Sequence, residues 1–114
     1  MQSETRPWGV YEILYDSEIC KVKKITINPQ QSPSYQYHHK RNEHWIVIEG
    51  QGQTKIDGKI CDIAAGDTVF LPMLAKHTII NTSADSQLVF IEVQTGSYFG
   101  EDDIVRLEDK YGRA

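Results

Sequence analysis

The stretches Gln36-x-His38-x4-Glu43-x6-Gly50 and Gly66-x5-Pro72-x4-His77-x3-Asn81 decide the expected fold and the expected site. Residues 36 and 38 are two apart, so their side chains leave the same face of an extended strand. A turn over His39–Asn42 returns Glu43 on the next strand, and a second hairpin places His77 to close the site. The pattern therefore predicts four metal ligands, which are Gln36, His38, Glu43 and His77.

These imidazole, carboxylate and amide groups suit one borderline divalent metal ion that keeps open coordination positions. Zn is the first choice, and Mn, Co, Ni and Fe are also admissible. Gln36 has an alternative role as a hydrogen-bonding strand residue, because amides are weak metal ligands. His39 and His44 each follow a predicted ligand directly, so they are expected on the opposite, outer face of their strands.

The rest of the chain is rich in short β-branched and aromatic runs separated by turn signals, and it contains no convincing helix. Asp57-Gly58 is a strong signal for a two-residue hairpin turn, because a type I′ turn needs positive φ at both central positions. Many short strands at near-regular spacing indicate a sandwich or barrel. The expected strands are Val10–Leu14, Lys21–Ile27, Ser34–His38, Glu43–Glu49, Gln53–Ile56, Lys59–Ile63, Thr68–Leu71, His77–Ile80 and Leu88–Gln94, with a further short strand possible at Ile104–Leu107.

The two opening stretches resemble the two signature motifs of the cupin family. Further runs resemble one subfamily, the cupin domain of type II mannose-6-phosphate isomerases, which is often fused behind a mannose-1-phosphate guanylyltransferase. These runs are Arg6-Pro7-Trp8-Gly9-Val10-Tyr11, Arg41-Asn42-Glu43-His44-Trp45, Gly100-Glu101-Asp102-Asp103-Ile104-Val105-Arg106 and Tyr111-Gly112-Arg113. The resemblance implies an all-β cupin double-stranded β-helix, or jelly-roll barrel. We expect residues 1–114 to be a single cupin domain with an N-terminal arm or edge strand at 1–15 and a C-terminal tail at 101–114.

The resemblance also implies a metal-dependent isomerase that converts mannose 6-phosphate to fructose 6-phosphate through an enediol. In that interpretation Glu92 is the candidate base and Arg41 an electrostatic partner or phosphate ligand. Strand parity puts Glu92 on an apolar face, where a buried carboxylate either has a raised pKa or pairs with an arginine. Lys23, Lys76 and Arg106 are candidate ligands for the phosphate of the substrate. For any one of these lysines, simple solvation on an edge strand is the alternative.

Two other functions compete with the isomerase. One is a non-catalytic cupin that binds a metal and a sugar phosphate, and the other is a different small metalloenzyme on the same barrel, such as an Fe-dependent dioxygenase. A fold alone does not fix an activity. The glutamine at position 36 and the basic residues around the site count against the dioxygenase.

Composition limits the partners and the compartment. The 114 residues carry a formal net charge of −4, which argues against a nucleic-acid partner. There is no apolar run long enough to span a membrane and no signal peptide, so a cytoplasmic location is expected. Cys20 and Cys61 are interpreted as reduced thiols. A homodimer is expected, with Arg6–Leu14 as a possible edge strand on a partner; the alternative is a monomer whose N-terminal strand pairs with its own sheet.

Overall fold

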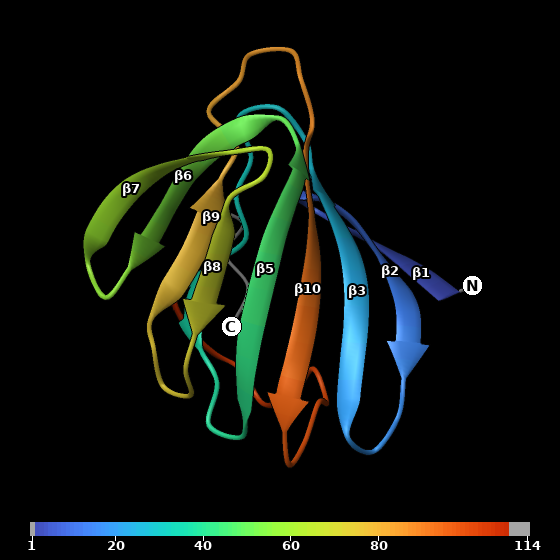
Figure 1. Ribbon diagram of the computed structural model, residues 1–114. Helices are drawn as coiled ribbons and strands as arrows, with labels where there is room; N and C mark the ends of the chain where they lie inside the picture. The colour runs from blue at the N-terminus through green and yellow to red at the C-terminus, as the bar shows by residue number, and fades with distance from the viewer. Residues whose placement is uncertain (1, 110–114) are drawn as a thin grey trace.

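The structure is a computed structural model that describes residues 2–109. Over this range the chain forms two antiparallel sheets, and it contains no helix long and apolar enough to cross a membrane. One sheet has the strand order β1-β2-β3-β10-β5-β8, and the other has the order β11-β4-β9-β6-β7 (Figure 1). The strands are β1 (Gln2–Arg6), β2 (Gly9–Asp16), β3 (Cys20–Ile27), β4 (Tyr35–Tyr37), β5 (Arg41–Glu49), β6 (Gln51–Ile56), β7 (Lys59–Ala64), β8 (Thr68–Leu71), β9 (His77–Ile80), β10 (Leu88–Gly96) and β11 (Val105–Glu108).

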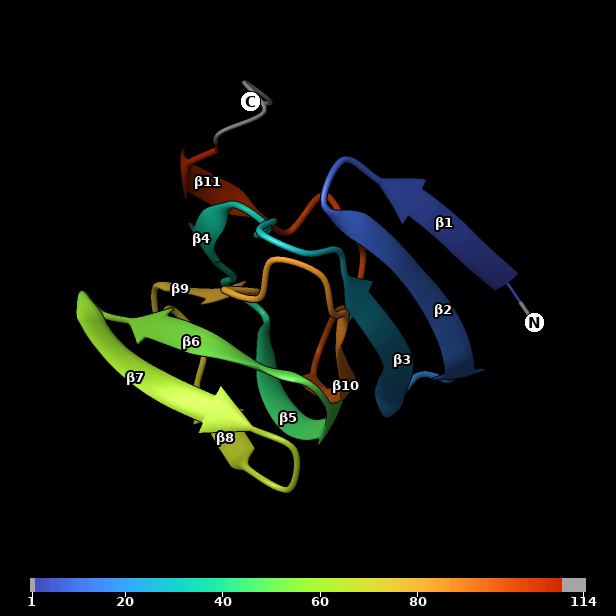
Figure 2. The same cartoon turned by 90° about the horizontal axis from the view of Figure 1, so that it is seen from above.

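Seen from above, the two sheets form opposite walls around a common interior, with β4 and β11 across from β2 and β3 (Figure 2). Strands distant in sequence pair within each sheet, as where β10 lies between β3 and β5. This arrangement is the predicted double-stranded β-helix. The Asp57-Gly58 hairpin is confirmed as well, since both residues have positive φ, 47° and 85°, between the paired residues Ile56 and Lys59.

The interior changes from apolar to charged along three neighbouring strands. On β3 the buried residues run Ile27, Ile25 and Lys23, and on β10 they run Leu88, Val89, Phe90, Glu92 and Gln94. On β5 they run Val47, Trp45, Glu43 and Arg41. The pairing of Glu92 with both Lys23 and Trp45 brings the charged positions to one end of the barrel. One end therefore forms the hydrophobic core, and the other end holds buried charges.

The N-terminal segment pairs with its own sheet. The sequence leaves two arrangements open for this segment, and the structure has this one rather than an edge strand on a partner. Strand β2 pairs with β3, and β1 pairs with β2 to form the edge of the sheet. Strand β1 falls within the N-terminal arm or edge strand expected at 1–15, although the polar run Gln2–Arg6 lacks the apolar alternation of a half-buried strand. At the other end β11 lies close to the expected Ile104–Leu107 strand, while the rest of the predicted tail, residues 110–114, falls outside the described residues.

Two smaller expectations about local structure can also be compared. Strand β5 starts at Arg41 rather than Glu43, because Arg41 and Asn42 pair with the end of β10, so the turn after His38 is shorter than expected. Cys20 and Cys61 are both free thiols, as predicted, and Cys61 is exposed.

Candidate metal centre

His38, Glu43 and His77 converge inside the charged end of the barrel, and all three are buried. Each offers one ligand atom, and these atoms lie within 4.8 Å of one another. The Nε2 atom of His38 lies 3.2 Å from Glu43 Oε2, and the Nε2 atom of His77 lies 3.7 Å from Glu43 Oε1. The two histidines therefore face the two oxygens of a single carboxylate. The sequence spacing predicted that these three side chains would meet, but not the route. Neither expected hairpin forms within the described residues 36–81, because β4 pairs with β9 in one sheet while Glu43 lies on β5 of the other sheet.

Both histidine rings are held by their other nitrogen. His38 Nδ1 donates to the carbonyl oxygen of Asp103 at 2.6 Å, and His77 Nδ1 donates to the carbonyl oxygen of Ala75 at 2.9 Å. Because a carbonyl can only accept, each Nδ1 carries a proton, and the Nε2 atom of each ring faces Glu43. Burial lowers the pKa of His77 despite the opposing charge of Glu43. Such backbone-anchored imidazoles are typical of metal ligands, so the donor set fits a divalent ion.

Glu43 is only 2% exposed, yet it is the negative centre of the site. Burial by itself would raise the pKa of Glu43, but His38, His77 and Arg41 together lower it well below its usual range. Arg41 donates to Glu43 Oε2 through Nε at 2.9 Å, and its Nη2 atom lies 2.9 Å from the same oxygen. Trp45 Nε1 donates to Glu43 Oε1 at 3.0 Å. The carboxylate is therefore both ionised and fixed in position.

Gln36, the fourth predicted ligand, lines the same cavity as these three residues. It pairs with His77 across β4 and β9, which brings it to the centre. Its Nε2 atom donates to the carbonyl oxygen of Ser34 at 3.3 Å. An anchored amide nitrogen is compatible with both roles considered for Gln36, as a ligand through its oxygen and as a hydrogen-bonding strand residue.

Glu92 is a second buried carboxyl group beside Glu43. Its Oε1 accepts from Trp45 Nε1 at 3.0 Å, so the indole N–H bridges both carboxyl groups. Gln94 Nε2 donates to Glu92 Oε2 at 2.7 Å. Burial, and then the charge of Glu43, raise the pKa of Glu92 to about 8. Near neutral pH this group therefore carries a proton and can act as a hydrogen-bond donor or a proton source.

The predicted basic residues do not all reach the site. Lys23, Arg41 and Arg106 line the cavity together with the metal-ligand candidates. Lys76 lies outside this cavity, with an exposed side chain near Asp57. His39 and His44 are both exposed, as strand parity predicts.

Three residues at the site had no predicted role. Asp103 anchors His38 and also accepts from the backbone N–H groups of His39 and Lys40, at 3.1 and 2.9 Å. Glu101 forms ion pairs with Lys23 and Arg41, and Trp45 bridges the two carboxyl groups. The run Glu101-Asp102-Asp103 is visible in the sequence as an acidic stretch, but nothing in its local pattern indicates contacts some 60 residues away.

Comparison with known proteins places this geometry in context. The family model described as "Mannose-6-phosphate isomerase C-terminal" matches residues 1–109. "Mannose-1-phosphate guanylyltransferase ManC" of Salmonella typhimurium is 41% identical, over 95% of this chain and 22% of that protein. "Alginate biosynthesis protein AlgA" of Pseudomonas aeruginosa is 44% identical with the same coverage. The crystal structure of a cupin 2 conserved barrel domain protein from Salinispora arenicola superposes with a TM-score of 0.68 at 23% identity, covering 76% of this chain and 75% of that one.

These comparisons confirm the cupin fold and correct the predicted activity. The prediction of a mannose 6-phosphate to fructose 6-phosphate isomerase is wrong, because the curated relatives are named for guanylyl transfer or alginate biosynthesis, and these names do not indicate an isomerase. The chain spans about a fifth of the length of these relatives, which are enzymes, and the matched region is the cupin barrel alone.

Proposed function

The chain belongs to the mannose-6-phosphate isomerase C-terminal family, and on this premise we propose that its barrel binds one divalent metal ion and, beside it, a small phosphorylated sugar. Mannose 1-phosphate is the first candidate ligand, because the names of several relatives contain it. Zn is the first metal to test, and Mn, Co, Ni and Fe also suit the donor set.

The observation that carries this proposal is the arrangement of His38, Glu43 and His77. Two buried imidazoles, each anchored through Nδ1, face one ionised carboxylate, and Gln36 lines the same cavity. These residues would hold the ion. A bound divalent ion supplies positive charge to oxygen atoms of the ligand.

The neighbouring side chains supply the recognition of the sugar phosphate. Lys23 and Arg41 are cations with 3% and 6% exposure that line the same cavity, and Arg106 also lines it. Such groups suit a phosphate. Glu92, which is protonated near neutral pH, can donate a hydrogen bond to a sugar hydroxyl. The cavity thus combines groups for the phosphate with groups for the hydroxyls.

A homodimer is the second part of the proposal, and the outer face of the larger sheet supports it. Ile46, Ile48 and Phe70 on β5 and β8 are 47%, 49% and 55% exposed. Phe70 packs against the outward ring of His44, with ring centroids 4.7 Å apart. Several exposed apolar side chains on one sheet face are a feature of protein interfaces. The cytoplasmic location remains a prediction.

Isothermal titration calorimetry with mannose 1-phosphate tests the proposal on protein stripped of metal and on the same protein reloaded with Zn. We expect mannose 1-phosphate to bind the reloaded protein and to bind the stripped protein at least about tenfold more weakly, because the stripped site lacks the positive charge that the ion supplies to ligand oxygens. His77→Ala should behave like the stripped protein. The matched control is His44→Ala, which removes an exposed histidine from the outer face of β5 and should bind like wild type. Equal binding by stripped and reloaded protein would refute the metal dependence.

A further inference from the structure

Lys23 is a buried cation whose partner comes from a distant part of the chain. Its Nζ forms an ion pair with Glu101 Oε2 at 3.2 Å. The ammonium also lies 4.2 Å from the centroid of the Tyr11 ring. A charge that is only 3% exposed is costly without compensation, so the Glu101 carboxylate stabilises this position.

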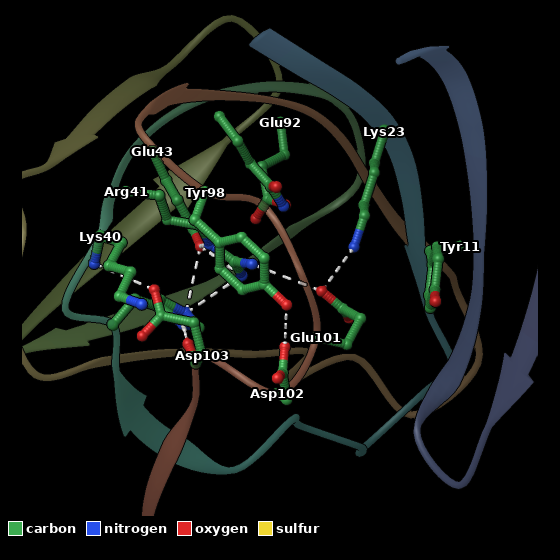
Figure 3. A network of polar contacts seen from close by, with 12 residues as sticks. Tyr11, Lys23, Lys40, Arg41, Glu43, Glu92, Tyr98, Glu101, Asp102 and Asp103 are labelled. Atoms are coloured by element: carbon green, nitrogen blue, oxygen red, sulfur yellow. Dashed lines mark hydrogen bonds and ion pairs between the residues drawn. The ribbon is translucent and has the colours of Figure 1, made fainter. Parts of the chain in front are cut away.

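The same oxygen of Glu101 also meets Arg41. Arg41 Nη1 donates to Glu101 Oε2 at 3.4 Å, so one carboxylate oxygen lies between an ammonium and a guanidinium (Figure 3). Both cations line the cavity that contains His38, Glu43 and His77. An anionic group therefore already occupies the point where two buried cations converge, next to the candidate metal centre.

Glu101 is held less firmly than the cations that it contacts. Its side chain is 45% exposed, whereas Lys23 and Arg41 are almost fully buried. The segment that carries it is anchored elsewhere, through Asp103, whose carbonyl accepts from His38 and whose carboxylate accepts from two backbone N–H groups. The carboxylate of Glu101 can therefore turn out to solvent while these anchors stay in place.

We propose that Lys23 and Arg41 form the anion subsite of the cavity, and that Glu101 is an internal competitor which the phosphate of the ligand displaces. This inference rests on the proposed function, which it deepens by naming the phosphate position. A phosphate monoester carries up to two charges and three terminal oxygens, so it can bind the ammonium and the guanidinium together, where Glu101 offers one oxygen. The displaced carboxylate is then hydrated at the mouth of the cavity.

Titration of inorganic phosphate against wild type and Glu101→Gln tests the inference. Glutamine keeps the size of the side chain but removes its charge. If Glu101 fills the subsite nine-tenths of the time, its removal strengthens apparent phosphate affinity about tenfold, because only the open fraction of wild type is competent to bind. Lys23→Gln should lower the phosphate affinity of both backgrounds.

The matched control is Asp102→Asn, which removes the same charge from the same turn. Asp102 is exposed and accepts from Tyr98 rather than from either cation. The Asp102→Asn variant should leave phosphate affinity unchanged. A Glu101→Gln affinity equal to or weaker than that of wild type would overturn the inference, as would equal tightening by Asp102→Asn, which would indicate a general effect of net charge.

Performing the titration with and without Zn separates this inference from the proposed function. If wild type binds Zn and mannose 1-phosphate while Glu101→Gln fails to tighten phosphate binding, the proposed function is supported, and the proposal that Glu101 competes with phosphate is refuted. If no Zn binds, the metal centre fails, but tighter phosphate binding by metal-free Glu101→Gln still supports the subsite. Absence of phosphate binding in every variant overturns the subsite.

Discussion

Replacing Glu43 by Gln should destabilise the protein strongly, because it removes the negative centre of a buried charge cluster. Glu43 is 2% exposed and lies 2.9 Å from two nitrogens of Arg41, which is itself 6% exposed. Removing one partner of a buried ion pair costs about 3–5 kcal/mol. Glu92 offsets part of this cost: the charge of Glu43 helps to raise its pKa, so in the variant Glu92 ionises more readily and partly replaces the lost charge. We therefore expect a loss of about 3 kcal/mol at pH 7 in metal-free protein.

Urea denaturation of metal-free protein, followed by tryptophan fluorescence, measures this loss. With a slope of about 2 kcal/mol per molar urea, the unfolding midpoint should fall by about 1.5 M. Glu49→Gln, an exposed position at the end of the same strand, is the matched control and should stay within about 0.5 kcal/mol of wild type. Replacing Arg41 by Met together with Glu43→Gln should recover part of the loss, since no unpaired buried guanidinium remains. A Glu43→Gln midpoint equal to that of Glu49→Gln would refute the reasoning.

Three further predictions concern other parts of the molecule. Trp45→Phe removes the N–H that bridges two buried carboxyl groups and should cost about 1–3 kcal/mol in the same urea assay; an unchanged midpoint would show that the bridge contributes nothing. Burial opposes ionisation of Glu101, but Lys23 and Arg41 lower its pKa overall, so its ion pairs stabilise the fold above the ordinary pKa of 4.5 and are lost as pH falls below it. Thermal melts from pH 7 down to pH 3 should therefore show a smaller acid-induced loss of stability in Glu101→Gln, and parallel profiles would contradict this. Light scattering should give wild type a mass of about twice 13.0 kDa and Ile46→Lys/Phe70→Lys a single-chain mass, whereas a wild-type monomer would exclude the dimer.

Much of the fold follows from local patterns in the sequence. The period-two alternation of β10 correctly places Glu92 on the buried face with Phe90, and the Asp57-Gly58 turn has the predicted conformation. These two features need no knowledge of how the two sheets pack. The meeting of His38, Glu43 and His77 does need it, because β4 and β9 are paired in one sheet and Glu43 comes from β5 of the other sheet.

The parts that the sequence does not predict depend on contacts between distant segments. Glu101 meets Lys23 only because the chain after β10 crosses the mouth of the barrel, and no period or turn signal encodes that crossing. Lys76 is a predicted site residue but lies outside the site. It is adjacent in sequence to His77, but neighbouring side chains in an extended chain point to opposite faces, so Lys76 is exposed. Adjacency to a ligand in sequence is therefore a poor guide to membership of the site.

The most direct test of the central claim is the metal content of the purified protein after incubation with Zn and removal of excess ion, measured by inductively coupled plasma mass spectrometry. Wild type should hold about one ion per chain, and the double variant His38→Ala/His77→Ala should hold almost none. The double variant His39→Ala/His44→Ala removes the other two histidines, both exposed, and should match wild type. Stoichiometric metal in the first double variant, or loss of metal only in the second, would contradict the account.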